Sequence, residues 1–225
     1  MKALAIDSAA ANMVIAAKND NLTATVSLDL GQKQSQKILP AIDYVLNEAG
    51  LKAKDLDYTA LCAGPGTFTG LRLAFSALKA IELSCNVPVY GIPSLEAYAF
   101  PFRNFPKQII SVIDAKKDQF FAAVYRGEKT EMEAEDTTAE KVLSKIDKSE
   151  EIIIAGPDAK IFGENLKKLD PNLKIFWTEF APLPTGSLFT IAESMIEQKK
   201  EPLADYSGPV YIRKSEAELA LESKK

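Results

Sequence analysis

The 225-residue sequence contains no histidine and only two cysteines. Histidine is the usual general base, the usual activator of a serine or cysteine nucleophile and the commonest transition-metal ligand in proteins. Its absence excludes histidine-dependent hydrolases and zinc sites built on histidine. Two cysteines are too few for a disulfide scaffold or a cysteine-based metal cage.

Long apolar runs and an excess of positive charge are also missing. No apolar stretch approaches the ~20 residues that a membrane-spanning helix needs, and Asp7 interrupts the N-terminus too early for a secretory signal. We therefore expect a cytoplasmic protein with no membrane contact. A net charge of −4 argues against autonomous binding to a phosphate backbone, which requires clustered Lys and Arg. Any RNA contact would need a partner.

The first half of the chain alternates between the hydrophobic periods of strands and helices. The predicted elements are strands at 2–8, 13–17 and 22–30, a helix at 32–49, a strand at 58–63, a helix at 69–84 and a short strand before Gly91. Apolar and polar residues alternate strictly over 22–30, which predicts a half-exposed strand. Gly50 ends the first helix.

The same order of elements returns in the second half. The predicted elements are strands at 108–114, 120–126 and 128–133, a helix at 138–146, a strand at 151–155, a helix at 158–169 and a strand at 173–176. Short motifs repeat with them, because Ile6-Asp7-Ser8 is echoed by Ile113-Asp114-Ala115 and Ala63-Gly64-Pro65-Gly66 by Ala155-Gly156-Pro157-Asp158. The chain is therefore expected to contain two duplicated lobes.

We expect an α/β fold in which a βββαβα unit with a mixed sheet occurs twice. The first lobe would span 1–100 and the smaller second lobe 107–177, with a C-terminal return segment at 178–225 whose helix at 187–199 packs back on the first lobe. This order is typical of the actin-like, ribonuclease H-like superfamily that includes sugar kinases and Hsp70 ATPases (ASKHA). Its members bind ATP between lobes, but a fold alone does not establish ATP binding.

The most specific segment connects the strand at 58–63 to the helix at 69–84. It reads Gly64, Pro65, Gly66, Thr67, Phe68, Thr69, Gly70, Leu71 and Arg72. Its glycines permit close backbone approach, and the helix amides that follow could hold an anion. The segment is neither a Walker A loop nor a dinucleotide fingerprint. A phosphate cradle and a structural turn both remain open from these residues alone.

Taken whole, this segment resembles the Gly-Pro-Gly-Ser-Phe-Thr-Gly-Leu-Arg signature of the TsaB family, also called YeaZ, with Thr67 in the serine position. The resemblance covers nearly the whole chain. It extends to residues 4–8, 38–43, 91–97, 112–115 and 209–213. It implies an actin-like fold and a role beside the catalytic paralogue TsaD and the ATPase TsaE, which transfer threonylcarbamoyl to adenosine-37 of tRNA (t6A).

The resemblance further implies a non-catalytic scaffold subunit that binds and activates TsaD. TsaD holds a metal with a His-x-x-x-His pair, whereas the matching residues 31–37 here contain no imidazole. We therefore expect no catalytic residue, no metal site and no required cofactor, with at most weak or interface-dependent binding of adenine nucleotide. Contact with tRNA would occur only through the complex.

Two helices of the first lobe are the expected contact with TsaD, or with a second copy when the chain is alone. The candidate interface residues are Leu39, Ile42, Val45, Leu46, Leu71, Phe75 and Leu78. On the second helix the polar residues form one narrow stripe at helical spacing, made of Arg72, Ser76, Lys79 and Glu82. An ordinary intramolecular core explains the apolar positions equally well.

Asp7 and Asp114 occupy positions where active superfamily members place metal-coordinating or phosphate-organising carboxylates. Each could instead cap a hairpin, since no Gly-rich phosphate hairpin lies beside Asp7. If either carboxylate binds magnesium, the chain would be an ATP-dependent kinase or ATPase. A peptidase is a third hypothesis, but the sequence contains neither His-Glu-x-x-His nor a Ser-His pair.

Overall fold

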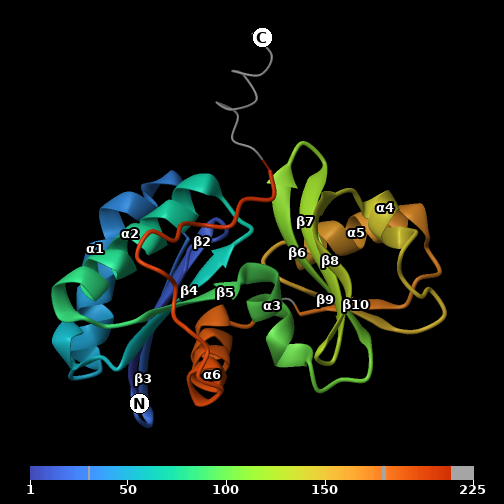
Figure 1. The fold of residues 1–225 in the computed structure, drawn as a ribbon. Helices are drawn as coiled ribbons and strands as arrows, with labels where there is room; N and C mark the ends of the chain where they lie inside the picture. Colours follow the sequence, from blue (N-terminus) through green and yellow to red (C-terminus); the bar gives the residue numbers. More distant parts are fainter. Residues whose placement is uncertain (30, 179–180, 214–225) are drawn as a thin grey trace.

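The computed structural model describes residues 1–29, 31–178 and 181–213 (Figure 1). Leu30, with which the third predicted strand ends, and the part of the C-terminal segment beyond 213 lie outside the described residues. Within the described part of the chain, no helix is both long and apolar enough to cross a membrane.

The first lobe is a five-stranded mixed sheet with two long helices on its outer face. Its strands are β1 (Lys2–Asp7), β2 (Asn12–Asn19), β3 (Leu22–Asp29), β4 (Tyr58–Gly64) and β5 (Val89–Pro93), and its helices are α1 (Gln34–Glu48) and α2 (Phe68–Cys85). The strand order is β3-β2-β1-β4-β5. β1 pairs antiparallel with β2 and parallel with β4. The mixed sheet is as predicted.

The second lobe repeats this plan. Its strands are β6 (Gln108–Lys116), β7 (Gln119–Arg126), β8 (Lys129–Thr137), β9 (Ile152–Ala155) and β10 (Ile175–Trp177), and its helices are α4 (Ala139–Leu143) and α5 (Ala159–Leu169). Read from β8, the order β8-β7-β6-β9-β10 matches that of the first sheet strand for strand. The predicted duplication is confirmed.

The largest differences from the predicted element boundaries in the second lobe concern β8 and the helix that follows it. β8 continues to Thr137 because it stays paired with β7 up to Phe120. The helix expected at 138–146 ends at Leu143, since its last turn tightens. There the Lys145 amide donates to the Val142 carbonyl and the Ser144 hydroxyl donates to the Lys141 carbonyl. Both bonds satisfy carbonyls that would otherwise lack partners at a helix end.

A helix follows each lobe: α3 (Ser94–Ala99) lies between the lobes, and α6 (Pro184–Glu197) lies against the sheet of the first lobe (Figure 1). α3, where the sequence predicts no helix, packs on β6 and β7 as well as on β4 and β5. α6 packs on β1, β2, β4 and β5, and the two helices also contact each other. One apolar cluster therefore runs through both lobes, from Ala5 through Leu95 and Leu188 to Ile113.

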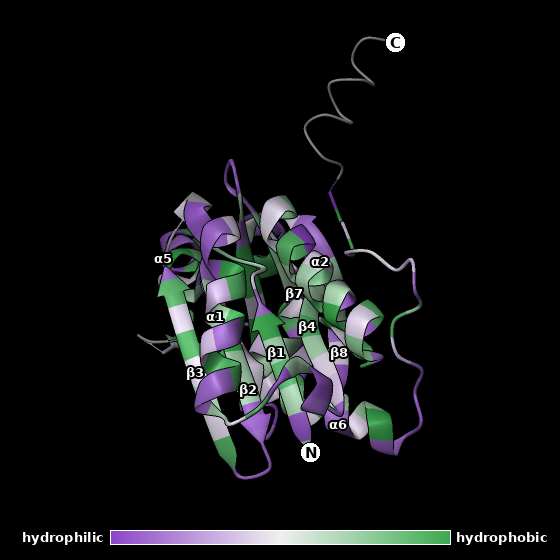
Figure 2. Ribbon diagram, turned by 90° about the vertical axis from the view of Figure 1, so that its left-hand side faces the viewer, coloured by the Kyte–Doolittle hydropathy of each residue, from purple (hydrophilic) through white to green (hydrophobic). Residues whose placement is uncertain are grey.

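The outer helices cover a separate apolar layer on the first sheet. Leu4, Ile6 and Ile15 of the strands pack against Val45 of α1 and Phe75 of α2. Figure 2 shows hydrophilic and hydrophobic stretches alternating along α1, the pattern of a helix with one buried face. Sheet and helices together position the loop at residues 64–72 at the edge that faces the second lobe.

Candidate functional site

The signature segment, residues 64–72, forms a close junction with two other parts of the backbone. The peptide bond between Gly64 and Pro65 is cis. Gly64 has a φ of +121°, and a Cβ there would overlap the carbonyl oxygen of Val210. A Cβ at Gly70 would overlap the carbonyl oxygen of Ser8. Glycine is needed at both positions because the neighbouring backbone occupies the space of a side chain.

Hydrogen bonds hold this junction from three sides. The Ser8 hydroxyl donates to the Gly70 carbonyl at 2.7 Å, and the Thr67 amide donates to the Ala9 carbonyl at 2.7 Å. The Gly64 amide donates to the Ser94 hydroxyl at 3.1 Å. Since two amides of the loop are already bonded within the chain, the geometry favours the structural turn over the phosphate cradle for this part of the segment.

The start of α2 carries a stack of three side chains that the sequence did not reveal. The rings of Phe68 and Tyr211 are stacked with centroids 4.7 Å apart. The Arg72 guanidinium lies 3.8 Å from the Phe68 centroid, and its Nε donates to the Tyr211 hydroxyl at 3.1 Å. Tyr211 belongs to the family-like stretch 209–213, which was the available signal, but no local pattern relates that stretch to residues 64–72.

Asp7 is buried, with 3% of its surface exposed, and its carboxylate oxygens have partners. It accepts hydrogen bonds from the Ala9 amide at 2.9 Å and from the Tyr98 hydroxyl at 2.8 Å. Burial raises the pKa of Asp7, although these bonds and one from Cys62 act in the opposite direction. Burial and the nearby carboxylate likewise raise the pKa of Tyr98. The arrangement joins β1 to α3 and leaves no face of Asp7 open to solvent.

The raised pKa of Asp7 makes a prediction for the variant Asp7→Asn. Between the ordinary value of 3.8 and the folded-state pKa, the folded protein retains a proton that the unfolded chain has lost. The contribution of Asp7 to stability is therefore present at low pH and is lost as pH rises through the folded-state pKa. The asparagine amide oxygen can still accept a hydrogen bond.

We expect Asp7→Asn to be at least as stable as the wild type at pH 7. The difference in the free energy of unfolding between the two proteins should shrink as pH falls toward 4. Urea denaturation at several pH values measures it, with Asp57→Asn, an exposed aspartate at the same sheet, as the control. A large loss of stability at pH 7 in Asp7→Asn would contradict the prediction.

Asp114 lies at the matching place in the second lobe, in different surroundings. It is half-buried, accepts the Lys116 amide at 2.7 Å and forms an ion pair with the Lys116 ammonium at 2.6 Å. The Asp114 amide donates to Asp158 at 2.7 Å, and burial raises the pKa of Asp158. Both lobes therefore cap the hairpin with an aspartate. Among the described residues, no three His, Cys, Asp or Glu side chains are grouped as a metal site would require.

A small hollow separates the signature segment from the second-lobe hairpin. Its volume is about 210 Å³, below the roughly 300–1,000 Å³ typical of small-molecule sites. The lining residues come from three segments: Pro65, Gly66, Thr67, Phe68; Asp114, Ala115, Lys116, Phe121; and Val210, Tyr211, Ile212, Arg213. The third segment contacts both lobes, because the Val210 amide donates to the Ala63 carbonyl and Arg213 donates to the Ala115 carbonyl.

The seven candidate interface residues divide into one exposed and six buried side chains. Leu39 is 65% exposed. The others, none more than 7% exposed, are Ile42, Val45, Leu46, Leu71, Phe75 and Leu78. Leu71 faces the interlobe cluster, and the rest belong to the apolar layer under α1 and α2. A partner could reach only the outer edge of this set.

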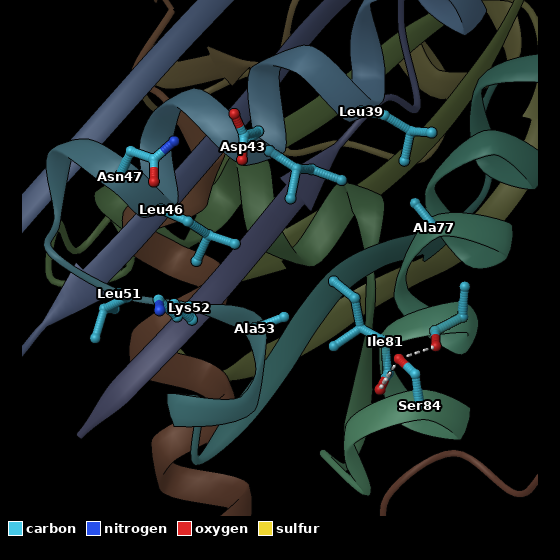
Figure 3. A pocket seen from close by; sticks show the side chains of 12 residues that line it. Leu39, Asp43, Leu46, Asn47, Leu51, Lys52, Ala53, Ala77, Ile81 and Ser84 are labelled. Carbon is cyan, nitrogen blue, oxygen red and sulfur yellow. Dashed lines mark hydrogen bonds between the residues drawn. The ribbon is translucent and has the colours of Figure 1, made fainter.

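A groove of about 360 Å³ runs between α1 and α2 on the outer surface of the first lobe. Figure 3 shows Leu39 and Leu46 from α1 and Ala77 and Ile81 from α2 facing the same hollow. Asp43, Asn47, Lys52 and Ser84 add polar groups to its lining. Large apolar side chains are also exposed on both helices, with Tyr44 at 54% and Leu83 at 86%. Ile81 is not among the seven candidate residues, and only packing places it at the groove.

Comparisons with known proteins agree with this fold. Over 177 residues the chain is 31% identical to the tRNA threonylcarbamoyladenosine biosynthesis protein TsaB of Buchnera aphidicola from Schizaphis graminum, covering 74% of this chain and 84% of the relative. The chain belongs to the TsaB family. It is also 25% identical to TsaB of Escherichia coli over the full length of both chains. A model of the family "TsaD: tRNA N6-adenosine threonylcarbamoyltransferase" matches residues 29–174.

Solved structures share the fold of this chain. A Pseudomonas aeruginosa protein described as similar to the peptidase YeaZ superposes with a TM-score of 0.79 at 22% identity, covering 94% of this chain and 99% of that one. The ethanolamine utilization protein EutJ of Carboxydothermus hydrogenoformans superposes with a TM-score of 0.51 at 11% identity, covering 83% of this chain and 88% of that one. At these identities the likeness concerns the fold alone.

Proposed function

We propose that this chain is the non-catalytic partner subunit of the complex that makes N6-threonylcarbamoyladenosine at position 37 of tRNA, and that it binds and activates a TsaD subunit. Membership of the TsaB family supports the pathway. The α1–α2 groove supports the partner role, because it is an apolar hollow with the exposed Leu39 in its lining, and Tyr44 and Leu83 are exposed elsewhere on the same two helices. An apolar hollow with exposed apolar side chains is typical of protein-binding surfaces.

TsaD is the proposed occupant of the groove because it is a paralogue. The family model matched by residues 29–174 is that of the catalytic subunit, so the two proteins are expected to have equivalent helix pairs. Two such pairs would form a four-helix interface, and a second copy of this chain would take the same place when TsaD is absent. TsaE and tRNA would join only through the complex, and no cofactor would be required beyond weak or interface-dependent adenine nucleotide.

The experiment that tests this proposal is binding of the pure chain to a cognate TsaD subunit, measured by size-exclusion chromatography with light scattering. We compare Leu39→Glu with Leu22→Glu. Both leucines are 65% exposed, but only Leu39 lines the groove, whereas Leu22 lies at the start of β3. Placing a charge in the groove should weaken the complex about tenfold or more, while the change at Leu22 should leave affinity within about twofold.

Failure of the wild-type chain to bind a cognate TsaD would overturn the proposal. Equal loss of affinity in both variants would also contradict it, because the groove would then have no special part. The kinase or ATPase alternative predicts magnesium-dependent nucleotide binding by the isolated chain. The burial of Asp7 and the ion pair of Asp114 count against that alternative.

A further inference from the structure

After α6 the chain returns across the first lobe and reaches the second lobe at Arg213. Residues 203–213, which we call the strap, run over β5 and α2 toward the hairpin of the second lobe (Figure 1). The Leu203 amide donates to the Val89 carbonyl at 2.8 Å, and the Val210 amide donates to the Ala63 carbonyl at 2.7 Å. These two backbone bonds anchor the strap to β5 and β4.

The strap also binds the polar stripe of α2. The Lys79 ammonium donates to the carbonyls of Leu203 and Ala204 at 3.2 and 2.9 Å. One end of the strap therefore lies beside Lys79, and the other carries Tyr211, which is bonded to Arg72 and stacked on Phe68. With 3.6 residues per turn, positions 68, 72 and 79 lie on one side of α2 and the groove residues Ala77, Ile81 and Ser84 on the opposite side.

Arg213 attaches the far end of the strap to the second lobe. Its Nε and Nη2 donate to the two carboxylate oxygens of Asp136 on β8, at 2.5 and 2.7 Å. Its Nη1 donates to the Ala115 carbonyl on β6 at 2.6 Å. A bidentate arginine–carboxylate pair is the strongest and most directional of side-chain ion pairs. The strap thus connects the second lobe to the side of α2 that faces away from the groove.

We propose that the strap couples the second lobe to the partner surface, with Arg213 and Tyr211 as positioning residues that hold α2 in place behind the α1–α2 groove. This inference rests on the proposed function for the identity of the partner, but the coupling itself does not. It assigns a role to the second lobe, which otherwise only repeats the fold. It also gives two residues of the polar stripe of α2, Arg72 and Lys79, a role, since both bond to the strap.

Hydrogen–deuterium exchange of the full chain tests the coupling without any partner. Arg213→Ala should release the strap and raise exchange of the Val210 amide and of the segment 64–72 about tenfold or more, because a charge-assisted fork is lost. The matched control is Arg126→Ala. Arg126 also forms a carboxylate fork, with Glu150, but its contacts with Glu131 and Glu150 stay within the second lobe.

Two further variants separate coupling from a general loss of stability. Asp136→Ala should reproduce most of the effect of Arg213→Ala, since it leaves only the bond from Arg213 to the Ala115 carbonyl. The double variant should add nothing to Arg213→Ala, because the pair is already lost. Tyr211→Phe retains the ring stack and should restore most of the protection that Tyr211→Ala loses. Two results with Arg213→Ala would overturn the coupling. One is faster exchange throughout the chain, and the other is an unchanged exchange rate in the segment 64–72.

The same variants are then titrated with TsaD. Arg213→Ala should weaken binding about tenfold while Arg126→Ala keeps wild-type affinity. Unchanged affinity together with raised exchange would overturn the positioning role and leave the proposed function standing. If the wild type itself does not bind TsaD, the proposed function and the positioning role both fail, and the exchange data still decide whether the strap couples the lobes.

Discussion

Gly70→Ala is expected to lower the free energy of unfolding by about 3 kcal/mol. Gly70 is the third residue of α2, and a Cβ there would overlap the Ser8 carbonyl oxygen and lie 2.6 Å from the Thr67 hydroxyl oxygen. The carbonyl belongs to backbone at the end of β1, so it cannot turn away as a flexible side chain would. The start of α2 must shift, and the Ser8–Gly70 hydrogen bond is strained with it.

Gly186→Ala is the matched control for this change. Gly186 is likewise the third residue of its helix, α6, but a Cβ there meets no atom within 4 Å. Alanine is the better helix former by about 1 kcal/mol, so this variant should be as stable as the wild type or slightly more so. Urea denaturation followed by circular dichroism compares the two. Similar effects of both substitutions would show that helix propensity, and not contact with Ser8, decides the outcome.

Val45→Glu should strongly destabilise the first lobe. Val45 is completely buried between α1 and the first sheet, and a carboxylate there would have no partner in the apolar layer that surrounds it. Burying an unpaired charge costs several kcal/mol, a large part of the roughly 5–15 kcal/mol that stabilises a domain. We expect a loss of about 4 kcal/mol or more, seen as a much lower urea midpoint.

The variant at the neighbouring position, Tyr44→Glu, distinguishes the effect of a surface substitution from that of a core substitution. Tyr44 lies on the same helix and is 54% exposed, so its replacement should change stability by less than about 1 kcal/mol. Loss of TsaD binding in Val45→Glu would therefore report unfolding and not contact, and the same holds for Phe75→Glu. Val45→Glu with wild-type stability would contradict the packing of α1 described above.

The local patterns predict most strands and helices because each pattern depends only on which face of that one element is covered. Alternation along β3 reports a strand with one covered face, and the helical period of α1 reports one buried stripe. The sequence pattern does not predict α3, because this helix has no single covered face. Its residues 94–99 are buried on almost all sides, between both sheets and α6, so they show no amphipathic period.

The candidate site was predicted in part. The segment 64–72 was recognisable as a specific motif because several glycines in a short stretch, between a strand and a helix, are rare. The sequence left open whether it holds phosphate or closes a junction, because that depends on Ser8, Ala9, Ser94 and Val210, which are distant in the chain. The interface residues on α1 and α2 were recognised as apolar, but periodicity alone does not say which apolar residue a sheet covers.

Composition and repeated patterns were enough to establish a duplicated α/β chain without histidine chemistry, since these properties depend on residue types and on neighbours one or two turns away. Contacts between distant segments needed the tertiary structure. Only the folded chain shows that Asp7 bonds Tyr98, that Leu39 alone among the seven candidates is exposed, and that Arg213 reaches Asp136. Such pairings depend on how the two lobes and the strap pack against one another, and the local periodicity of the sequence carries no information about that packing.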